Sequence, residues 1–266
     1  MKLKPVTSNN SARLRDSDAR VRGKMQRGEA LERATEKQVK RISDLQRVFY
    51  ADGRYAFLIV LQGRDASGKD GTIRKVFTAV NPQGCSVTSF KAPTDNEQRH
   101  DFLWRVHAHV PPRGMIGIFN RSHYEDILVP RARRLLPKSI WSARYDQIND
   151  FEAMLAANDV IILKFMLHIS RDEQKQRLLA RLEDATKNWK FRAGDLDDRA
   201  LWDDYTKAYE GVLAHTSTQW APWFVVPADD NDVRNWLVAG AIAARMKKLD
   251  LRYPPADPAI LKIEID

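Results

Sequence analysis

Residues 57–72 read FLIVLQGRDASGKDGT, and this stretch decides the fold of the 266-residue chain. Its first five residues form a continuous apolar run, which is typical of a strand buried on both faces of a parallel sheet. Residues 63–69 match the pattern G-x-x-x-x-G-K, and a helical pattern follows over 69–79. A strand, such a loop and a helix in this order predict a phosphate-binding loop, or P-loop.

The predicted loop suits phosphate because of its glycines, its position and its lysine. Gly63 and Gly68 allow a tight turn in which successive backbone N–H groups point at phosphate oxygens. The N-terminus of the following helix adds partial positive charge, and Lys69 adds a mobile full charge. The alternative is an ordinary glycine-containing turn between a strand and a helix. We expect phosphate or nucleotide contacts from Gly63, Arg64, Ala66, Ser67, Gly68, Asp70, Gly71 and Thr72.

One position departs from the usual pattern of this loop. The residue after the lysine is usually Ser or Thr, which binds magnesium, but here it is Asp70, and Thr72 follows two residues later. Magnesium must then be held differently, and Asp65 inside the loop is the first candidate. Asp70 has the alternative role of a favourable negative charge at a helix N-terminus.

A polar cluster follows another apolar run. Residues 115–119 read MIGIF and lead into NRSHYED at 120–126. Neighbouring parallel strands end at the same edge of a sheet, so we expect this cluster to face the bound phosphates. Arg121 could neutralise charge on a transferred phosphoryl group, and Asn120 could orient a metal-bound water or an acceptor oxygen. The expected catalytic residues are Asp65, Lys69 and Arg121.

The acids of this cluster have two interpretations. Carboxylates after the strand could bind a metal, and Ser122 with Glu125 could instead form a capping box at a helix start. Both can hold, since capping leaves Asn120, Arg121 and Asp126 free. The expected metal ligands are Asp65, Asn120, Glu125 and Asp126.

Strand and helix patterns alternate along the chain. The predicted strands are 57–61, 86–90, 115–119, 160–169 and 223–226. The predicted helices begin near residue 31 and then cover 69–79, 97–109, 122–136, 139–157, 171–184, 201–216 and 232–249. This order predicts an α/β fold with a parallel sheet flanked by helices.

The sequence also suggests a division of the chain. Residues 1–28 are polar and predict a flexible or loosely attached arm, and the following helix ends at about Gly53. We therefore expect an N-terminal arm and helix over 1–50 and a P-loop domain over 51–266. Residues 171–200 are expected to form a lid, because a closing lid would exclude water from the phosphates.

Composition narrows the class of protein. The chain has 44 Lys and Arg against 35 Asp and Glu, a net charge of +9, which indicates a polyanionic partner or only a solvated basic surface. Its single cysteine, Cys85, excludes an intramolecular disulfide. The longest apolar stretch, 160–167, is interrupted by Lys164 and is too short to span a bilayer. We expect a soluble, cytoplasmic protein that binds neither membranes nor nucleic acid.

Five motifs occur in one order and together resemble the polyphosphate kinase 2 family. They are GRDASGKDGT, SFKAPT, FNRSHYED, WKF…GDL…R and WAPWFVVPADD, and the likeness covers roughly residues 40–250. The resemblance implies a thymidylate-kinase-like P-loop fold with a helical lid. It also implies transfer of phosphate between inorganic polyphosphate and nucleotides with Mg²⁺, or Mn²⁺ as an alternative, by a homo-oligomer.

One residue bears on the acceptor. Many members of that family have Asp where this chain has Asn120, and the Asn form followed by HYED resembles the class III members. That likeness implies that both AMP and ADP are phosphorylated, giving ADP and ATP. Losing a carboxylate weakens a metal site in principle, and Glu125 or Asp126 could compensate. The alternatives are a polyphosphate kinase restricted to ADP or GDP, an ATP-dependent nucleoside-monophosphate kinase, and a non-catalytic nucleic-acid-binding module.

Cations outside the loop are expected to hold a long polyanion. A track of Lys and Arg would make binding sensitive to salt, by analogy with nucleic acids. The alternative for the two lid arginines is a solvated helix face with ion pairs four residues apart. The expected additional phosphate contacts are Lys75, Lys91, Asn120, Arg133, Arg177, Arg181 and Lys190.

Overall fold

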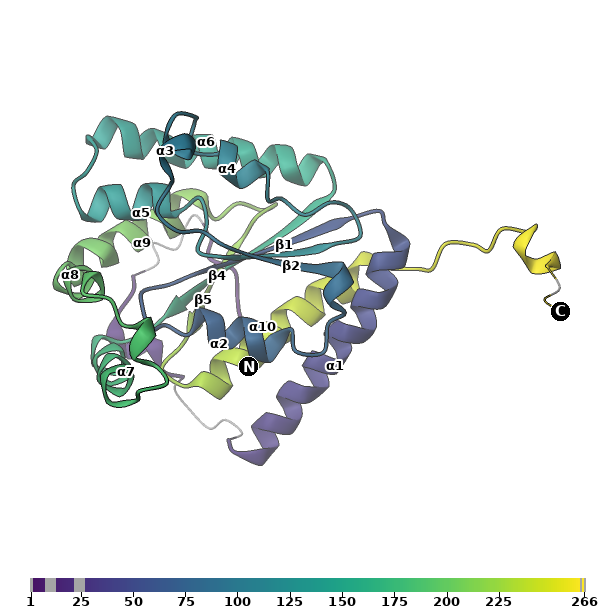
Figure 1. The fold of residues 1–266 in the computed structure, drawn as a ribbon, viewed down its shortest axis with the longest axis horizontal. Helices are drawn as coiled ribbons and strands as arrows, with labels where there is room; N and C mark the ends of the chain where they lie inside the picture. The colour runs from purple at the N-terminus through teal and green to yellow at the C-terminus, as the bar shows by residue number, and fades with distance from the viewer. Residues whose placement is uncertain (1, 8–12, 22–26, 264, 266) are drawn as a thin grey trace.

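A computed structural model describes residues 2–7, 13–21, 27–263 and 265 of the chain. These residues contain a five-stranded sheet in the order β2-β3-β1-β4-β5, and every pair of neighbours is parallel (Figure 1). The strands are β1 Ala56–Gln62, β2 Cys85–Ser89, β3 Ile116–Asn120, β4 Val160–His168 and β5 Trp223–Pro227. The predicted α/β fold with a parallel sheet is therefore confirmed.

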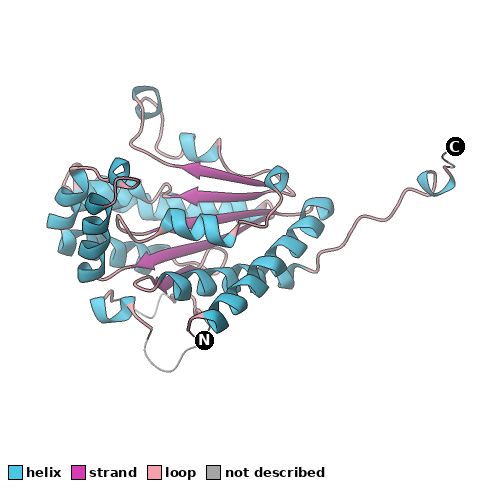
Figure 2. Ribbon diagram, turned by 60° about the horizontal axis from the view of Figure 1, so that its bottom comes forward, coloured by secondary structure: helices cyan, strands magenta, loops and turns pink. Residues whose placement is uncertain are grey.

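Helices cover both faces of this sheet (Figures 1 and 2). One face carries α1 (Glu29–Asp52), α2 (Lys69–Val76) and α10 (Asn231–Met246). The other carries α5 (Glu125–Ala132), α6 (Lys138–Ala157) and α9 (Trp202–Thr216). All residues of β1 are buried, and alternate side chains enter the two separate cores, as expected for a central strand.

The register of β1 and β3 makes the two strands end side by side at one edge of the sheet. Leu61 of β1 lies opposite Asn120 of β3. The loops that follow these two strands therefore start side by side, and Arg121 N–H donates to the Leu61 carbonyl at 3.0 Å. The parallel pairing thus brings the P-loop and the 120–126 cluster together, as the sequence predicts.

The helix predicted over 69–79 ends at Val76, and two other predicted helices are shortened more strongly. The helix predicted over 97–109 is two short pieces, α3 (Asp95–Gln98) and α4 (Trp104–His107), because Thr94 caps the first and the Asp101 carboxylate starts a new turn by accepting from Leu103 N–H. The helix predicted over 122–136 is α5 alone, since Arg134 adopts a left-handed φ of 56° that ends it.

The predicted lid is helical but interrupted. It consists of α7 (Arg171–Glu183), the 3₁₀ turn η3 (Asn188–Lys190) and α8 (Gly194–Ala200). Ser170 caps α7 by accepting from Glu173 N–H, as predicted. The other 3₁₀ turns are η1 (Asp16–Ala19), η2 (Pro82–Gly84), η4 (Lys247–Leu249) and η5 (Ile260–Lys262).

The described part of the N-terminal arm is attached to the body, so the expectation of a loose arm is wrong for these residues. Val6 N–H donates to the Trp223 carbonyl at 2.8 Å, at the edge of β5. Asp229 N–H donates to the Ala19 carbonyl at 3.1 Å, and Arg20 pairs with the Asp229 carboxylate at 2.8 Å. The rest of the predicted arm, residues 1, 8–12 and 22–26, lies outside the described residues.

Helix α1 shares its core with the P-loop domain. Its buried Leu31, Ile42 and Phe49 belong to the same apolar cluster as Leu237 of α10. The boundary predicted at residue 50 therefore divides segments that share one core, and it stays a prediction.

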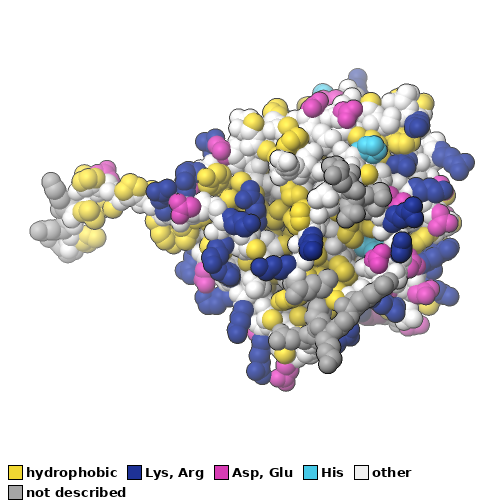
Figure 3. All heavy atoms as spheres, turned by 180° about the vertical axis from the view of Figure 1, so that it is seen from behind, with side chains coloured by type: hydrophobic (Ala, Val, Ile, Leu, Met, Phe, Trp, Pro, Cys, Tyr) yellow, Lys and Arg dark blue, Asp and Glu magenta, His cyan; other side chains and the backbone are white. Residues whose placement is uncertain are grey.

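On the face seen from behind in Figure 3, Lys and Arg side chains are spread out, with acidic and apolar side chains among them. Arg252 N–H still donates to the Asp52 carboxylate at 2.9 Å, and beyond this contact the chain extends away from the body (Figures 1 and 2). Within the described ranges, no helix combines the length and apolarity that a membrane span requires.

Candidate active site at the phosphate loop

The loop between β1 and α2 is a compact turn around two glycines. A Cβ on Gly63 would lie 2.7 Å from the Leu167 carbonyl oxygen. Gly68 has a φ of 96°, and a Cβ there would lie 2.2 Å from Nη1 of Arg234. Neither position accepts a side chain, and the loop can hold this shape only because both residues are glycine.

Lys69 begins α2 and is buried in the loop. Its Nζ donates to the carbonyls of Gly63 at 2.7 Å and Arg64 at 3.2 Å. Burial, reinforced by the nearby Arg121 cation, lowers the pKa of Lys69 to about 8. The Lys69 ammonium is therefore hydrogen-bonded to two neutral carbonyl oxygens of the loop. A bound phosphate would give it an anionic partner.

Arg121 joins the two halves of the site. Its Nη2 donates to the Asp65 carboxylate at 2.5 Å and its Nη1 to the Glu125 carboxylate at 3.2 Å. The Glu125 and Asp65 charges raise the pKa of Arg121 above its ordinary value. Arg121 also has a left-handed φ of 62°, which is rare outside glycine and common at functional sites. The structure thus brings Asp65, Arg121 and Glu125 together.

A small cavity lies at this junction. Its walls come from the P-loop, the β3–α5 junction, the lid and α9. An anion bound to the loop in this cavity would therefore also contact the lid. The lining residues are Gly63, Arg64, Asp65, Arg121, Glu125, Leu128, Gln174, Asp198, Tyr205 and Tyr209.

Asp70 and Asn120 form a second contact between the two halves. Asn120 Nδ2 donates to the Asp70 carboxylate at 2.7 Å. Asp70 therefore has a specific partner across the site in addition to its favourable place in the first turn of α2. An amide opposite Asp70 can donate to it, whereas a second carboxylate could not.

The acidic residues fit a magnesium site only in part. Among the residues that the structure describes, no group of three or more His, Cys, Asp or Glu side chains is placed to hold a metal ion. Magnesium usually keeps several waters and binds one or two carboxylates together with substrate phosphates, so Asp65 and Glu125 suffice as a partial site. Their present partner is the Arg121 guanidinium.

Asp126 lies elsewhere, although the sequence predicts it as a metal ligand. Its carboxylate is 3.4 Å from Arg105 and 3.9 Å from Arg144, and these two cations occupy it. Burial raises the pKa of Asp126, and the two arginines oppose that shift. The side chain therefore joins α5 to α4 and α6, and the structure does not bring it to Asp65.

Arg64 also departs from its predicted role, because its side chain leaves the loop. It is buried against α9, donating to the Trp202 carbonyl at 2.8 Å and to Thr206 Oγ1 at 2.6 Å. Its guanidinium carbon lies 3.9 Å from the centre of the Trp202 ring. Cation–π contact and hydrogen bonding hold the side chain there, so only the backbone of Arg64 remains for phosphate.

Arg177 of α7 grips backbone carbonyls. Its Nη1 donates to Ala66 at 3.0 Å, and its Nη2 donates to Ala228 at 2.8 Å and Asp229 at 2.7 Å. Its Nε donates to Glu173 at 2.8 Å. Arg177 therefore clamps the P-loop, the lid and the β5–α10 loop together in this structure, and its phosphate contact stays a prediction.

The remaining predicted cations contact other side chains. Lys75 pairs with Glu32 at 3.7 Å, Arg133 with Asp198 at 2.7 Å and Arg181 with Asp195 at 3.3 Å. Lys190 lies over the Trp189 ring at 5.1 Å, and Lys91 is exposed at the end of β2. In the described part of the chain, none of these five side chains forms a hydrogen bond or an ion pair with the P-loop.

Thr72 and Ser67 face into the protein. Thr72 Oγ1 accepts from Arg234 Nε at 2.7 Å, so its hydroxyl is turned toward α10. Ser67 is fully buried, and its hydroxyl has no hydrogen-bond partner within the described part of the chain. A Cβ on Gly71 would lie 3.4 Å from Nη2 of Arg234. Arg234 thus underlies the whole start of α2.

Sequence reasoning missed several residues at this site. Gln174 of α7 donates to the Asp65 carbonyl at 3.1 Å, and Tyr205 and Tyr209 of α9 line the small cavity. The two tyrosines are four residues apart on a helix, which indicates only a common face. Arg234 lies in a predicted helix far along the chain, and no sequence pattern links it to the loop.

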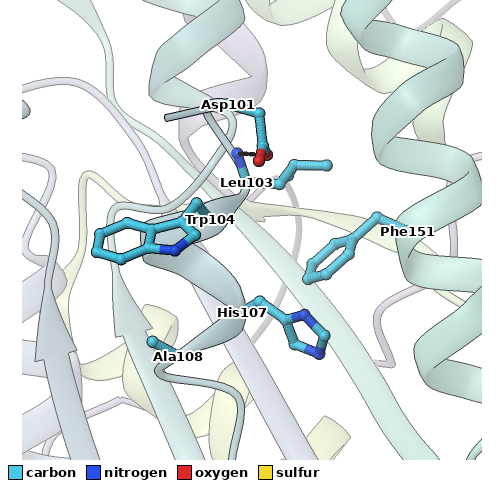
Figure 4. A pocket seen from close by; sticks show the side chains of 6 residues that line it. All are labelled: Asp101, Leu103, Trp104, His107, Ala108 and Phe151. Carbon is cyan, nitrogen blue, oxygen red and sulfur yellow. Dashed lines mark hydrogen bonds between the residues drawn. The ribbon is translucent and has the colours of Figure 1, made fainter. Parts of the chain in front are cut away.

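A larger cavity of about 540 Å³ lies between α4 and α6 (Figure 4). Phe151 and His107 meet there edge to face at 5.5 Å, and Trp104 stacks on His100 at 4.1 Å. None of the predicted site residues lines this cavity, which is formed by Asp101, Leu103, Trp104, His107, Ala108 and Phe151.

Comparison with known proteins agrees with this geometry. The sequence profile of the family described as Polyphosphate kinase 2 (PPK2) matches residues 25–253. An AMP/ADP-polyphosphate phosphotransferase of Meiothermus ruber is 52% identical over 227 residues, 85% of each chain. An ADP-polyphosphate phosphotransferase of Rhodopseudomonas palustris is 47% identical over 234 residues, 84% of this chain and 81% of that one.

A solved structure agrees as well. The crystal structure of polyphosphate kinase 2 from Arthrobacter aurescens TC1 superposes with a TM-score of 0.88 at 37% identity, covering 98% of this chain and 97% of that one. The profile match spans most of the chain, and the fold agrees from end to end. The chain therefore belongs to the polyphosphate kinase 2 family.

Proposed function

We propose that this protein is a phosphotransferase that moves the terminal phosphate of inorganic polyphosphate onto AMP and ADP, forming ADP and ATP, in a reversible reaction. The observation that carries the proposal is the convergence of Lys69, Asp65 and Arg121 at one phosphate loop. The relative from Meiothermus ruber, named for both AMP and ADP, supports the choice of acceptors.

The reaction needs positioning and charge more than covalent chemistry from the protein. A phosphate oxygen of AMP or ADP, already deprotonated, attacks the terminal phosphorus of polyphosphate. The bond to the bridging oxygen breaks, and that oxygen stays on the shortened polyphosphate as an anion. Lys69 and Arg121 stabilise the negative charge that spreads over the moving phosphoryl group. No side chain is phosphorylated.

Magnesium, or manganese in its place, is the proposed metal. Asp65 would hold it, with Glu125 and Asn120 as further ligands from the β3–α5 junction. When bound, the metal neutralises charge on the phosphates. Arg121 would then exchange its carboxylate partners for phosphate oxygens.

The loop backbone and nearby cations are the groups that we propose to hold polyphosphate. The backbone N–H groups of the loop between Gly63 and Gly68 hold the terminal phosphates, and the exposed Lys91 and the half-buried Lys75 and Lys190 extend the track. Residues 171–200 act as the lid. We place the protein in the cytoplasm as a homo-oligomer, with residues 1–50 as an extension of the P-loop domain.

The first test is an incubation of the purified protein with magnesium, long-chain polyphosphate and AMP, without ATP. Chromatography should detect both ADP and ATP. A parallel reaction with ADP and no polyphosphate controls for ATP formed from two ADP molecules, and Lys69→Ala controls for contaminating kinases. ADP alone would restrict the acceptor to AMP. No product from AMP or ADP, with turnover restored by ATP as donor, would replace the proposal with a nucleoside-monophosphate kinase.

A further inference from the structure

Arg234 is a buried cation directly beneath the phosphate loop. It lies in the first turns of α10 and is only 2% exposed. Its Nη1 is so close to Gly68 that a Cβ there would lie 2.2 Å away, and its Nε donates to Thr72 Oγ1 at 2.7 Å. The guanidinium therefore contacts both the end of the loop and the first turn of α2.

All hydrogen-bond acceptors around Arg234 are neutral. Besides Thr72 they are the Ser67 carbonyl at 3.4 Å, Asn231 Oδ1 at 2.5 Å and Asn235 Oδ1 at 3.1 Å. In the described ranges no carboxylate oxygen lies within 4.0 Å of the Arg234 guanidinium, which is the distance limit for an ion pair. The hydrogen-bonding needs of the group are met, but its charge is not neutralised.

This arrangement is unfavourable for the protein alone. Buried arginines are normally paired with a carboxylate, because removing a charge from water is costly. Burial, with the nearby Arg177 cation adding to it, lowers the pKa of Arg234 to about 10, although the more distant Asp232 and Asp230 carboxylates oppose this shift. Arg234 therefore lacks a carboxylate in direct contact, and a phosphate bound in the loop that Arg234 supports would add negative charge beside it.

We propose that Arg234 is a positioning residue that strengthens the binding of phosphate anions to the loop through its buried charge, without contacting them. This inference rests on the proposed function of the loop as the phosphate site. Charges act strongly in this setting because the intervening medium is protein and not water. The cost of burying Arg234 in the free protein is then offset when the anion binds.

The proposal predicts that neutralising Arg234 weakens anion binding without weakening the fold. Asn231→Asp achieves this, because Asn231 Oδ1 already accepts from Arg234 Nη1. An acid also suits the first residue of α10, where it complements the helix dipole. The hydrogen bonds of Arg234 to Ser67 and Thr72 are left in place.

The test measures binding of inorganic tripolyphosphate with magnesium, without nucleotide, by calorimetry. We expect Asn231→Asp to bind about tenfold more weakly at low salt, with a smaller difference at high salt. Its unfolding midpoint without anion should be no lower than that of the wild type. Asn158→Asp is the matched control, since Asn158 is exposed and ends α6 at the opposite edge of the sheet.

Two substitutions of Arg234 separate charge from shape. Arg234→Lys keeps the cation and should retain most of the affinity, whereas Arg234→Met should lose it. Equal loss in both would overturn the proposal, and so would an Asn231→Asp affinity equal to that of the wild type or of Asn158→Asp. If Arg234→Met does not fold, Asn231→Asp carries the test. Binding without phosphate transfer would refute the proposed function and leave this inference standing.

Discussion

Lys69 shows at the scale of one residue how burial sets the conditions for binding. Its pKa in the free protein is about 8, below its ordinary value of 10.5, because the ammonium is buried among neutral carbonyls. Only the charged form attracts phosphate. We therefore expect the affinity for tripolyphosphate to fall as the pH rises through about 8, measured by calorimetry from about pH 6 to about pH 10.

The lowered pKa of Lys69 has the opposite effect on folding stability, which increases with pH. Between about pH 8 and the ordinary pKa of 10.5, the unfolded chain holds the Lys69 proton and the folded protein does not, so this group makes the protein more stable as the pH rises. Lys69→Ala should lack both pH-dependent steps and turn over at least about a hundredfold more slowly. An affinity step that persists in Lys69→Ala would assign the titration to another group.

Asn120 and Asp70 form the second residue-scale test. Asn120→Asp would place two carboxylates where one hydrogen bond of 2.7 Å now stands, and like charges that close cannot both ionise easily. A divalent cation relieves this repulsion, so we expect a lower magnesium requirement together with a changed ratio of AMP to ADP phosphorylation, measured with polyphosphate as the only donor. Identical ratios would remove the basis for the class III interpretation.

A second substitution tests whether the effect acts through this pair. In Asp70→Asn/Asn120→Asp, the amide and the carboxylate change places, and the hydrogen bond can form again. The magnesium requirement should return toward that of the wild type. If the double variant needs as little magnesium as Asn120→Asp alone, the contact between the two residues is not the cause.

At the scale of elements, Arg177 fastens α7 to the phosphate loop. Arg177→Met would leave the carbonyls of Ala66, Ala228 and Asp229 without this donor, at a cost of about 2 kcal/mol of unfolding free energy. Urea unfolding without any anion measures that cost. The exposed Lys175 of the same helix provides the control, Lys175→Met.

The result separates the clamp that the structure shows for Arg177 from the phosphate contact that the sequence predicts. A clamp lowers the stability of the free protein, whereas a phosphate ligand would be dispensable until phosphate binds. Unchanged unfolding of Arg177→Met, together with weaker tripolyphosphate binding, would restore the original prediction for this residue.

The elements themselves could largely be predicted, because apolar periodicity and turn residues are local signals. The sequence predicts the positions of the loop at Gly63–Lys69 and of the cluster after β3, since parallel strands bring their carboxyl ends to one edge. It does not predict which groups the side chains of Arg64, Arg177 and Asp126 contact in the folded protein. Whether an arginine or an acid faces a ligand or the protein depends on neighbours such as Trp202, which are distant in sequence and set by packing.

At the scale of the whole molecule, a buried ionic cluster joins segments from both halves of the chain. Lys164 of β4 donates to Glu152 of α6 at 2.5 Å, to Tyr124 Oη at 2.7 Å and to the Thr216 carbonyl at 2.8 Å. His123 lies 3.2 Å from the other Glu152 oxygen. The cluster therefore fixes His123 and Tyr124, which follow Arg121 along the chain after Ser122.

This cluster predicts strong coupling between its two charges. Glu152→Gln would leave Lys164 buried without its carboxylate, and we expect a loss of about 3 to 5 kcal/mol of unfolding free energy in urea titrations. Glu152→Gln/Lys164→Met should lose less than the two single variants together, because no unpaired charge remains. Asp44→Asn, which breaks the exposed pair with Lys40, is the control and should change stability little. Strictly additive losses would mean that Glu152 and Lys164 stabilise the protein independently, and that the junction carrying Arg121 does not depend on their pairing.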